Sequence, residues 1–379
     1  MDDYLMVLLR TIEVIALLYG LLIILYTIGW YLLKKDVSIP PSQGTRVSVL
    51  IAARNESLQI NHILHGLLGQ DYPSSLLEII LVDDHSEDST AEIISAFIKD
   101  NPSINITLIH AKKQGKKAAL SEALARASGQ FVLVTDADCS IRKTWVSTMV
   151  AIYRHQQVKL LLGPVMIEPG TQFFGRLQSL EFMSLIGSTA GASGIGFPAM
   201  ANGANLGFDR LAVAELGEEA LNDRHASGDD IFLLFAMLKK FGKKSVSFAF
   251  HENAVVKTGA LPNVMAFLRQ RLRWVSKSSG YTNIGIVLPA IIVFVFNLTF
   301  LVLLGMAFFY PYLILIYLLL ILFKFMIDYP LLSGVCSFMK SRKLLIWALP
   351  LEIIYPFYVV FVAVAGNIAG VSWKGRKVK

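Results

Sequence analysis

Acidic residues follow an apolar segment of this 379-residue chain in a pattern that could hold a divalent cation. The apolar run 131–135 leads directly into Asp136-Ala137-Asp138. Side chains two positions apart in an extended segment point the same way, so both carboxylates can face one site. Such oxygen donors suit Mg2+ or Mn2+, which usually keeps water and phosphate oxygens among its ligands. The spacing therefore predicts metal ligation, with two helix-capping turn aspartates as the simpler alternative.

A second acidic group, Asp83-Asp84, follows another apolar run. Asp88 and Ser89, which come after it, have a structural explanation, because Ser89-x-x-Glu92 matches a capping box. Asp83 and Asp84 precede that cap. An aspartate at a strand end can accept a hydrogen bond from a nucleobase or a ribose hydroxyl, so both a nucleoside contact and a structural role stay open here.

A third acidic pair, Asp229-Asp230, precedes the amphipathic helical pattern of residues 231–238. An aspartate at a helix start is often a cap. The alternative is a general base that accepts the proton of an acceptor hydroxyl.

Polar and basic side chains later in the chain could bind a diphosphate. Gln270, Arg273 and Trp274 share one face of a predicted helix that begins after Pro262. An amide, a guanidinium and an indole suit a diphosphate and a sugar ring, whereas a basic amphipathic helix on anionic headgroups is the alternative. Lys116 lies in a lysine-rich loop that is either solvated or in contact with a phosphate.

The elements that must position these residues alternate between strand and helix. The strand patterns are 47–52, 77–82, 104–109, 131–135 and 159–165, and the helical patterns are 56–70, 88–100, 115–128 and 143–155. Apolar strands separated by helices predict an α/β fold with a mostly parallel sheet and helices on both faces. Ligands bind such sheets beyond the carboxyl ends of the strands, where the acidic groups lie. Because no glycine-rich phosphate motif occurs, a phosphate ligand would need a cation between it and these carboxylates.

The composition excludes several classes of protein. With 54% hydrophobic and only 17% charged residues, the chain departs from a soluble domain, in which about a quarter of residues are charged. Two cysteines exclude a disulfide scaffold. The basic excess flanks apolar runs instead of forming a stripe, so we expect no nucleic-acid partner.

Long uncharged runs predict membrane-spanning helices. Residues 14–33 suffice for one crossing, and 281–323, interrupted by Tyr310-Pro311-Tyr312, for two more. Residues 344–373 form a fourth apolar segment, whose path the sequence leaves open.

These runs divide the chain into three parts. They are an N-terminal transmembrane helix (1–35), a cytosolic domain ending in an interfacial amphipathic helix (36–281), and a C-terminal membrane region of two to three segments with a basic tail (282–379). The basic clusters at 34–35 and 340–343 place the polar domain in the cytosol by the positive-inside rule. The same rule places the basic tail in the cytosol. Because four simple crossings would place it outside, one segment would have to be re-entrant or lie in the interface.

Taken together, the motifs resemble those of membrane-bound family 2 glycosyltransferases with the GT-A fold. The matching segments are Ala53–Glu56, Val82–Asp88, Gly115–Leu120, Thr135–Asp138, Asn202–Asn205, Gly228–Asp230 and Gln270–Trp274. The resemblance covers residues 47–275 and the flanking membrane segments. The branch it resembles most holds ceramide glucosyltransferases and poly-N-acetylglucosamine or hyaluronan synthases. It implies an inverting, hexosyltransferase-type enzyme, integral and multi-pass in a bacterial plasma membrane.

The resemblance also implies roles for single residues. Asp230 would be the catalytic base, and Asp138 would ligate Mg2+ or Mn2+. The residues that bind the nucleotide-sugar would be Glu56, Asp84, Lys116, Asp136, Gln270, Arg273 and Trp274. The acceptor region would include Asn202, Gly203, Asn205 and Asp229.

The expected partners are a nucleotide-diphospho-sugar donor, with a UDP-sugar favoured, a lipid or glycan acceptor, and the bilayer. Four apolar segments are few for a polymer channel, which favours single transfer to a lipid. A processive polysaccharide synthase of the same family is the alternative. A non-enzymatic transport or sensor protein is the alternative of another class, but Lys324, Asp328 and Glu352 give a transporter few intramembrane charges.

Overall fold

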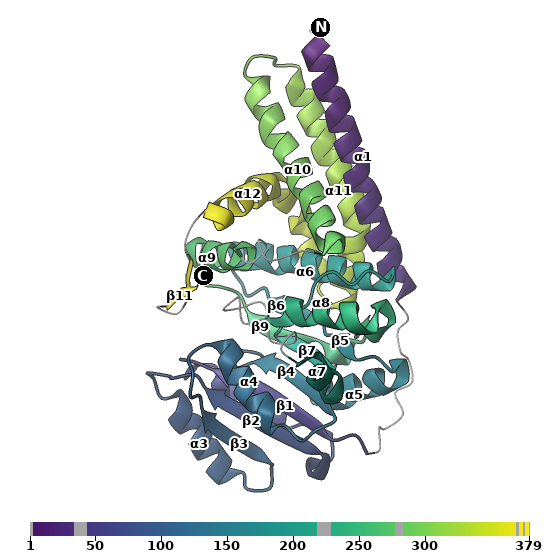
Figure 1. Cartoon of the computed structure of the whole chain (residues 1–379). Coiled ribbons are helices and arrows are strands. Elements are labelled where there is room, and N and C mark those ends of the chain that lie inside the picture. The colour runs from purple at the N-terminus through teal and green to yellow at the C-terminus, as the bar shows by residue number, and fades with distance from the viewer. Residues whose placement is uncertain are drawn as a thin grey trace. The chain divides into compact units, whose positions relative to one another are not determined.

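The computed structural model describes residues 3–33, 44–217, 229–276, 283–368, 371–373 and 376–378. Its residue contacts divide the chain into two compact units, both drawn in Figure 1. The first, hereafter the sheet unit, comprises Leu33–Glu168 and Met200–Gly259. The second, hereafter the helical unit, comprises Met1–Leu32, Pro169–Ala199 and Ala260–Lys379. The boundaries that the sequence predicts at residues 35 and 281 fall outside the described residues and stay predictions.

A seven-stranded sheet organises the sheet unit, in the order β3-β2-β1-β4-β7-β5-β8. Its strands are β1 (Val47–Ala53), β2 (Leu77–Asp83), β3 (Ile106–His110), β4 (Phe131–Asp136), β5 (Leu160–Leu162), β7 (Asn205–Asp209) and β8 (Val246–Phe248). The strands β3, β2, β1 and β4 run parallel, β7 is antiparallel to both β4 and β5, and β5 is parallel to β8. The predicted mixed, mostly parallel sheet is therefore confirmed. Six of the seven residues of β1 are buried, so side chains on both faces of this strand are covered.

The helices of the sheet unit follow the strands as the sequence predicts. They are α2 (Ile60–Leu68), α3 (Thr90–Asp100), α4 (Lys116–Arg126), α5 (Trp145–Gln156), α7 (Arg210–Leu216) and α8 (Asp229–Phe241), with short 3-10 helices η1 (Ser74–Leu76), η3 (Lys243–Ser245) and η4 (Glu252–Ala254). The cap of α3 differs from the predicted capping box. The side chain of Ser89 makes no capping hydrogen bond, and the Asp88 carboxylate instead accepts from the backbone N–H groups of Thr90 at 3.0 Å and Ser57 at 3.1 Å.

The predicted strand 159–165 is divided between two sheets. β5 ends before Gly163, and β6 (Val165–Glu168) pairs in parallel with β9 (Val256–Gly259). Pro164 has no N–H to donate to a neighbouring strand. A Cβ on Gly163 would lie 2.1 Å from the Asn205 side chain, so only glycine fits there.

Asn205 holds this division together. Its side chain is fully buried, and its amide N–H group donates to the carbonyls of Pro164 at 2.8 Å and Ala254 at 2.7 Å. Its amide oxygen accepts from the Trp145 indole N–H at 3.2 Å. One side chain thus ties β7 to α5, η4 and the β5–β6 junction.

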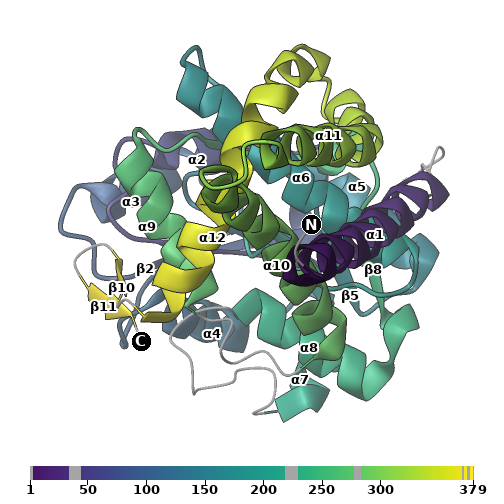
Figure 2. The same ribbon diagram turned by 90° about the horizontal axis from the view of Figure 1, so that it is seen from above.

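The helical unit consists mainly of long apolar helices. Its elements are α1 (Asp3–Leu32), α6 (Phe173–Gly194), α9 (Val264–Val275), α10 (Ile284–Ala307), α11 (Leu313–Phe338), η6 (Arg342–Trp347), α12 (Ala348–Ile368), β10 (Val371–Trp373) and β11 (Arg376–Val378). Figure 2 shows α10 and α11 beside α1. Within the described residues, four segments are long and apolar enough to cross a membrane, namely Asp3–Leu32, Ile284–Ala307, Leu313–Phe338 and Arg342–Gly366.

Buried charges explain why α11 extends beyond the uncharged run that ends at Phe323. The Lys324 ammonium contacts the Asp328 carboxylate at 2.6 Å and forms an ion pair with Glu352 of α12. The Tyr19 hydroxyl of α1 donates to Asp328 at 2.8 Å. Because the Lys324 ammonium pairs with both carboxylates, the charges are partly compensated and the helix can continue through them.

Glycines bring α6 close to α1. A Cβ on Gly191 would lie 2.2 Å from the carbonyl oxygen of Tyr26, and one on Gly29 would lie 2.0 Å from that of Gly191. Small residues allow such close approach of two helix backbones. This packing explains why α6, which the sequence places within a single cytosolic domain, groups with the apolar helices.

We predict that Gly191→Ala weakens the packing of α1 on α6. The added methyl group meets a backbone oxygen, and overpacking of this kind costs about 1–3 kcal/mol. The Tm of the purified full chain in detergent should fall. Gly305→Ala on α10 is the matched control, because its Cβ meets no atom of a neighbouring segment within 4 Å. Equal Tm values for the two variants would contradict the predicted contact.

We predict a larger loss of stability for Asn205→Ala than for Asn202→Ala. The first change leaves the Ala254 carbonyl and the Trp145 indole N–H buried without their partner, at about 1–3 kcal/mol for each group, while the Pro164 carbonyl keeps its bond from the Val256 N–H. The half-buried Asn202 side chain accepts one bond, from the Ala204 N–H at 2.9 Å, so its loss costs about 1 kcal/mol or less. Urea unfolding measures both values. The opposite ranking would show that Asn205 does not join these segments.

Candidate functional site

The carboxyl ends of three parallel strands bring predicted site residues to one edge of the sheet. In the strand pairing, Ala53 of β1 lies opposite Asp83 of β2, and Ala52 lies opposite Asp136 of β4. Asp83 and Asp136 are therefore the last residues of two strands that flank β1, as the sequence predicts for these two acidic groups. Neighbouring strands lie only about 5 Å apart, so negative charge accumulates at this edge.

Asp84 fixes the loop that leads into α4. Asp84 is 1% exposed, and one carboxylate oxygen accepts from the Gly115 N–H at 2.9 Å. Its backbone carbonyl accepts from the Arg54 guanidinium at 3.3 Å. Gly115 has a φ of 112°, which favours glycine. Asp84 thus has a structural role, and its predicted contact with a nucleoside stays a prediction.

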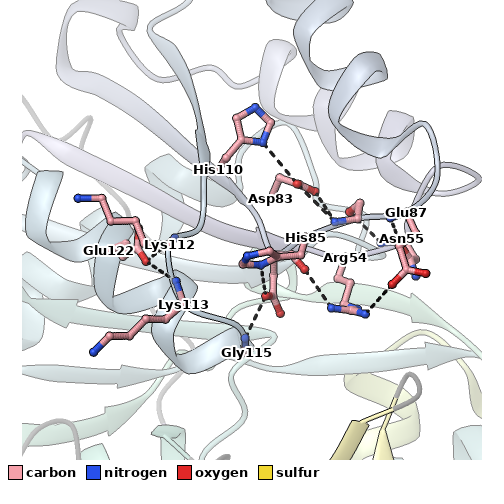
Figure 3. A network of polar contacts seen from close by, with 12 residues as sticks. Arg54, Asn55, Asp83, His85, Glu87, His110, Lys112, Lys113, Gly115 and Glu122 are labelled. Carbon is pink, nitrogen blue, oxygen red and sulfur yellow. Dashed lines mark hydrogen bonds and ion pairs between the residues drawn. The ribbon is translucent and has the colours of Figure 1, made fainter.

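A side chain of α4 also holds the lysine-rich loop in place. The Glu122 carboxylate accepts from the backbone N–H groups of Lys112 at 2.9 Å and Lys113 at 3.3 Å (Figure 3). The side chains of both lysines are exposed, in agreement with a solvated loop. Nearby, His110 contacts the Asp83 carboxylate at 3.5 Å.

Lys116, at the start of α4, points instead to the acidic edge. Its ammonium forms an ion pair with Asp136, and the two side chains are 35% and 32% exposed. Burial alone would lower the pKa of Lys116, but the Asp136 and Asp230 carboxylates hold it above its ordinary value. Lys116 therefore remains a cation at neutral pH.

Gly203 connects this ion pair to Asp230. A Cβ on Gly203 would lie 3.7 Å from both the Asp230 carboxylate and the Lys116 ammonium. The Gly203 N–H donates to one Asp230 oxygen at 2.9 Å, and the Ile231 N–H donates to the other at 2.9 Å. The structure thus brings four predicted site residues together, namely Lys116, Asp136, Gly203 and Asp230.

The remaining residues of the predicted acceptor region have different surroundings. The Asn202 side chain accepts a hydrogen bond from the Ala204 N–H, and the Asn205 side chain donates to Pro164 at the β5–β6 junction. The Asp229 side chain lies outside the described part of the structure. The Glu56 backbone N–H donates to the Thr90 hydroxyl at 2.8 Å, and the contact of its side chain with a nucleoside stays a prediction.

Asp138 has the donor chemistry of a divalent-metal ligand. Burial, and next the Asp136 carboxylate, raises the pKa of Asp138, so negative charge here is incompletely compensated. The Thr258 hydroxyl donates to Asp138 at 3.2 Å. Among the described residues, no group of three or more His, Cys, Asp or Glu side chains could hold a metal. A cation would therefore complete its shell with water and ligand phosphates, as Mg2+ and Mn2+ commonly do.

Thr258 is a site residue that sequence reasoning missed. The only signal for it is the short apolar run 254–256, which precedes Lys257-Thr258 and whose last residue, Val256, begins β9. Lys257 also pairs with Ser140 in an isolated β-bridge, which brings this strand beside the Asp136–Asp138 turn.

Arg271 is a second residue that the sequence did not single out. It lies on α9 of the helical unit, is 2% exposed, and contacts the Glu181 carboxylate of α6 at 2.5 Å. Its guanidinium lies 4.1 Å from the centre of the Trp274 ring. Glu181 also accepts from the Tyr358 hydroxyl of α12 at 3.1 Å. The expected contact of Gln270, Arg273 and Trp274 with a diphosphate stays a prediction.

Sequence comparison places the chain among known proteins. Residues 48–207 match "Glycosyl transferase family 2", and residues 131–364 match "Glycosyl transferase family group 2". A poly-beta-1,6-N-acetyl-D-glucosamine synthase of Staphylococcus aureus is 30% identical over 155 residues, which cover 41% of this chain and 36% of that protein. The Staphylococcus epidermidis protein of the same name is 32% identical over 37% of this chain and 34% of its own length. The chain thus matches about a third of the length of these relatives.

Structural comparison agrees on the fold. A mannosyltransferase from Pyrobaculum calidifontis, solved with GDP-mannose and Mn2+, superposes with a TM-score of 0.56 at 18% identity. The superposition covers 96% of this chain and 97% of that one. This likeness supports the GT-A fold, and the second family match spans more than half of the chain. The chain therefore belongs to the family 2 glycosyltransferases.

Proposed function

We propose that this protein transfers a sugar from a nucleotide-diphospho-sugar, with a UDP-sugar as the expected donor, to a membrane-associated lipid, with inversion at the anomeric carbon. The observation that carries this proposal is the arrangement of Asp230, Gly203, Lys116 and Asp136 at the carboxyl edge of the sheet. The mannosyltransferase solved with GDP-mannose and Mn2+ supports the general class of donor.

Asp230 is the proposed general base. Two backbone N–H groups fix the orientation of its carboxylate, and each carboxylate oxygen retains a lone pair for another partner. An acceptor hydroxyl within hydrogen-bond reach would transfer its proton to Asp230 as it attacks the anomeric carbon. A single displacement from the face opposite the diphosphate inverts the configuration.

Positive charge must stabilise the departing diphosphate. Lys116 supplies one cation at the acidic edge, and Asp138, with Asp136 beside it, would hold Mg2+ or Mn2+. When bound, such an ion stabilises the negative charge that develops on the leaving group. We propose that Gln270, Arg273 and Trp274 bind the diphosphate and line the acceptor pocket.

Four helical segments of sufficient length and hydropathy support an integral membrane protein. We propose that the sheet unit lies in the cytosol, in accord with the basic residues 340–343 between two of these segments.

A processive polysaccharide synthase is the second candidate, and the poly-N-acetylglucosamine synthases among the relatives favour it. The two candidates differ in their product. Membranes that contain the purified chain can be incubated with radiolabelled nucleotide sugars and Mg2+ or Mn2+. Label in the lipid extract supports single transfer, label in polymer supports the second candidate, and no transfer from any donor contradicts both.

We predict that Asp230→Asn lowers the rate of transfer by at least about 100-fold, because the amide cannot accept the hydroxyl proton. Nucleotide affinity should stay within about threefold, since Asn has nearly the same shape and keeps one oxygen for one of the two N–H contacts. Initial rates and calorimetric titration with UDP and GDP measure the two effects. Asp100→Asn, on an exposed residue at the end of α3, is the matched control. Full turnover by Asp230→Asn would rule out the assigned base.

We predict that Asp138→Ala abolishes the metal-dependent part of nucleotide binding. The change removes an oxygen donor, and the remaining Asp136 is already paired with Lys116. Affinity for UDP or GDP should be compared with Mn2+ and with EDTA, in the variant and in Asp100→Ala. If Mn2+ strengthens binding equally in both variants, Asp138 is not the ligand.

A further inference from the structure

The helical unit contains a hollow of about 460 Å³ at the junction of α11 and η6. Lys340, Arg342 and Lys343 line it with three cationic side chains, and Ser337 and Ser341 add hydroxyls. None of the lining residues is Asp or Glu. The hollow therefore has the chemistry of a site for an anion.

The turn that carries these cations is held by its own backbone. The Ser341 N–H donates to the carbonyl of Cys336 at 2.7 Å, and the Leu344 N–H donates to that of Ser341 at 3.0 Å. Lys340 has a φ of 56°, as expected for a residue that ends a helix in the left-handed region. Arg342 donates to the Ser337 hydroxyl at 2.8 Å, which orients its guanidinium. The backbone of the turn and the Arg342 guanidinium are thus held in place by contacts within the protein.

Apolar side chains are exposed on the elements beside this turn. Ile346 of η6 is 75% exposed, Leu349 of α12 is 47% exposed and Phe173 of α6 is 49% exposed. The Phe173 ring lies 5.0 Å from the Trp347 ring, and Arg176 lies 5.8 Å from the latter. Aromatic and basic side chains of this kind are typical of the membrane–water interface.

The two segments that meet at the turn are both long and apolar enough to cross a membrane. If they do so, as the proposed function requires, the turn lies at the level of the lipid headgroups. We propose that the hollow binds the phosphate of an anionic phospholipid from the surrounding bilayer, with its acyl chains along Ile346 and Leu349. Positive charge attracts the phosphate, and the adjoining apolar surface distinguishes a lipid from a free anion.

The test compares lipids on the full chain in detergent. Native mass spectrometry would measure the binding of phosphatidylglycerol and of phosphatidylcholine. We expect the wild type to favour phosphatidylglycerol, and the triple variant Lys340→Asn, Arg342→Gln, Lys343→Gln to bind it at least about tenfold more weakly. Asn is chosen at position 340 because it tolerates a positive φ.

A second triple variant, Lys239→Gln, Lys243→Gln, Lys244→Gln, removes the same charge from exposed positions of the sheet unit. It should bind phosphatidylglycerol as the wild type does. Ile346→Asn should weaken lipid binding while the affinity for inorganic phosphate is unchanged. The proposal is overturned if both triple variants bind phosphatidylglycerol equally, or if millimolar inorganic phosphate displaces the lipid. Alkaline extraction of membranes tests separately whether the chain is embedded in the bilayer. Transfer assays on the first triple variant test whether the loss of lipid binding changes the proposed reaction.

Discussion

Compensation of negative charge at the edge of the sheet is the constraint on which the proposed site depends. Parallel pairing of β1 with β2 and β4 places Asp83 and Asp136 at neighbouring strand ends. Asp138 follows within two residues, and Asp230 lies near the same lysine as Asp136. Carboxylates at such separations repel one another unless positive charge lies among them. Lys116 supplies part of that charge, and the raised pKa of Asp138 marks where more is needed.

The position of Lys116 depends in turn on contacts that carry no catalytic group. Asp84 holds the Gly115 N–H, and the φ of Gly115 turns the chain so that α4 begins at Lys116. Glu122 holds the preceding loop from the same helix. The proposed base, Asp230, and the predicted nucleotide residues are therefore linked through one loop. This link explains how a buried residue such as Asp84 can be needed for the geometry of the site without contacting a substrate.

The sequence predicts the local features of this arrangement well. The ends of β1, β2 and β4 agree with the predicted strands within a residue, because mostly apolar runs that end at charged residues leave little choice. The contacts that the sequence could not predict join distant segments. Asn205 bonds to Ala254, Thr258 bonds to Asp138, and no periodic pattern records either pair. The division of the strand 159–165 follows from one such contact, since Asn205 fills the space beside Gly163.

In the helical unit, too, the sequence does not predict which helix faces pack against one another. Its helices present Leu, Ile, Val and Phe on most faces, and such uniform surfaces allow more than one register between neighbours. A buried charge is tolerated only in the register that brings it to its partner, because an unpaired charge there costs several kcal/mol. Lys324 fixes α11 against Glu352 of α12, and Arg271 fixes α9 against Glu181 of α6. We infer that these pairs are retained for register more than for net stability. By this argument Arg271, which no sequence pattern marks, sets the orientation of the helix that carries Gln270, Arg273 and Trp274.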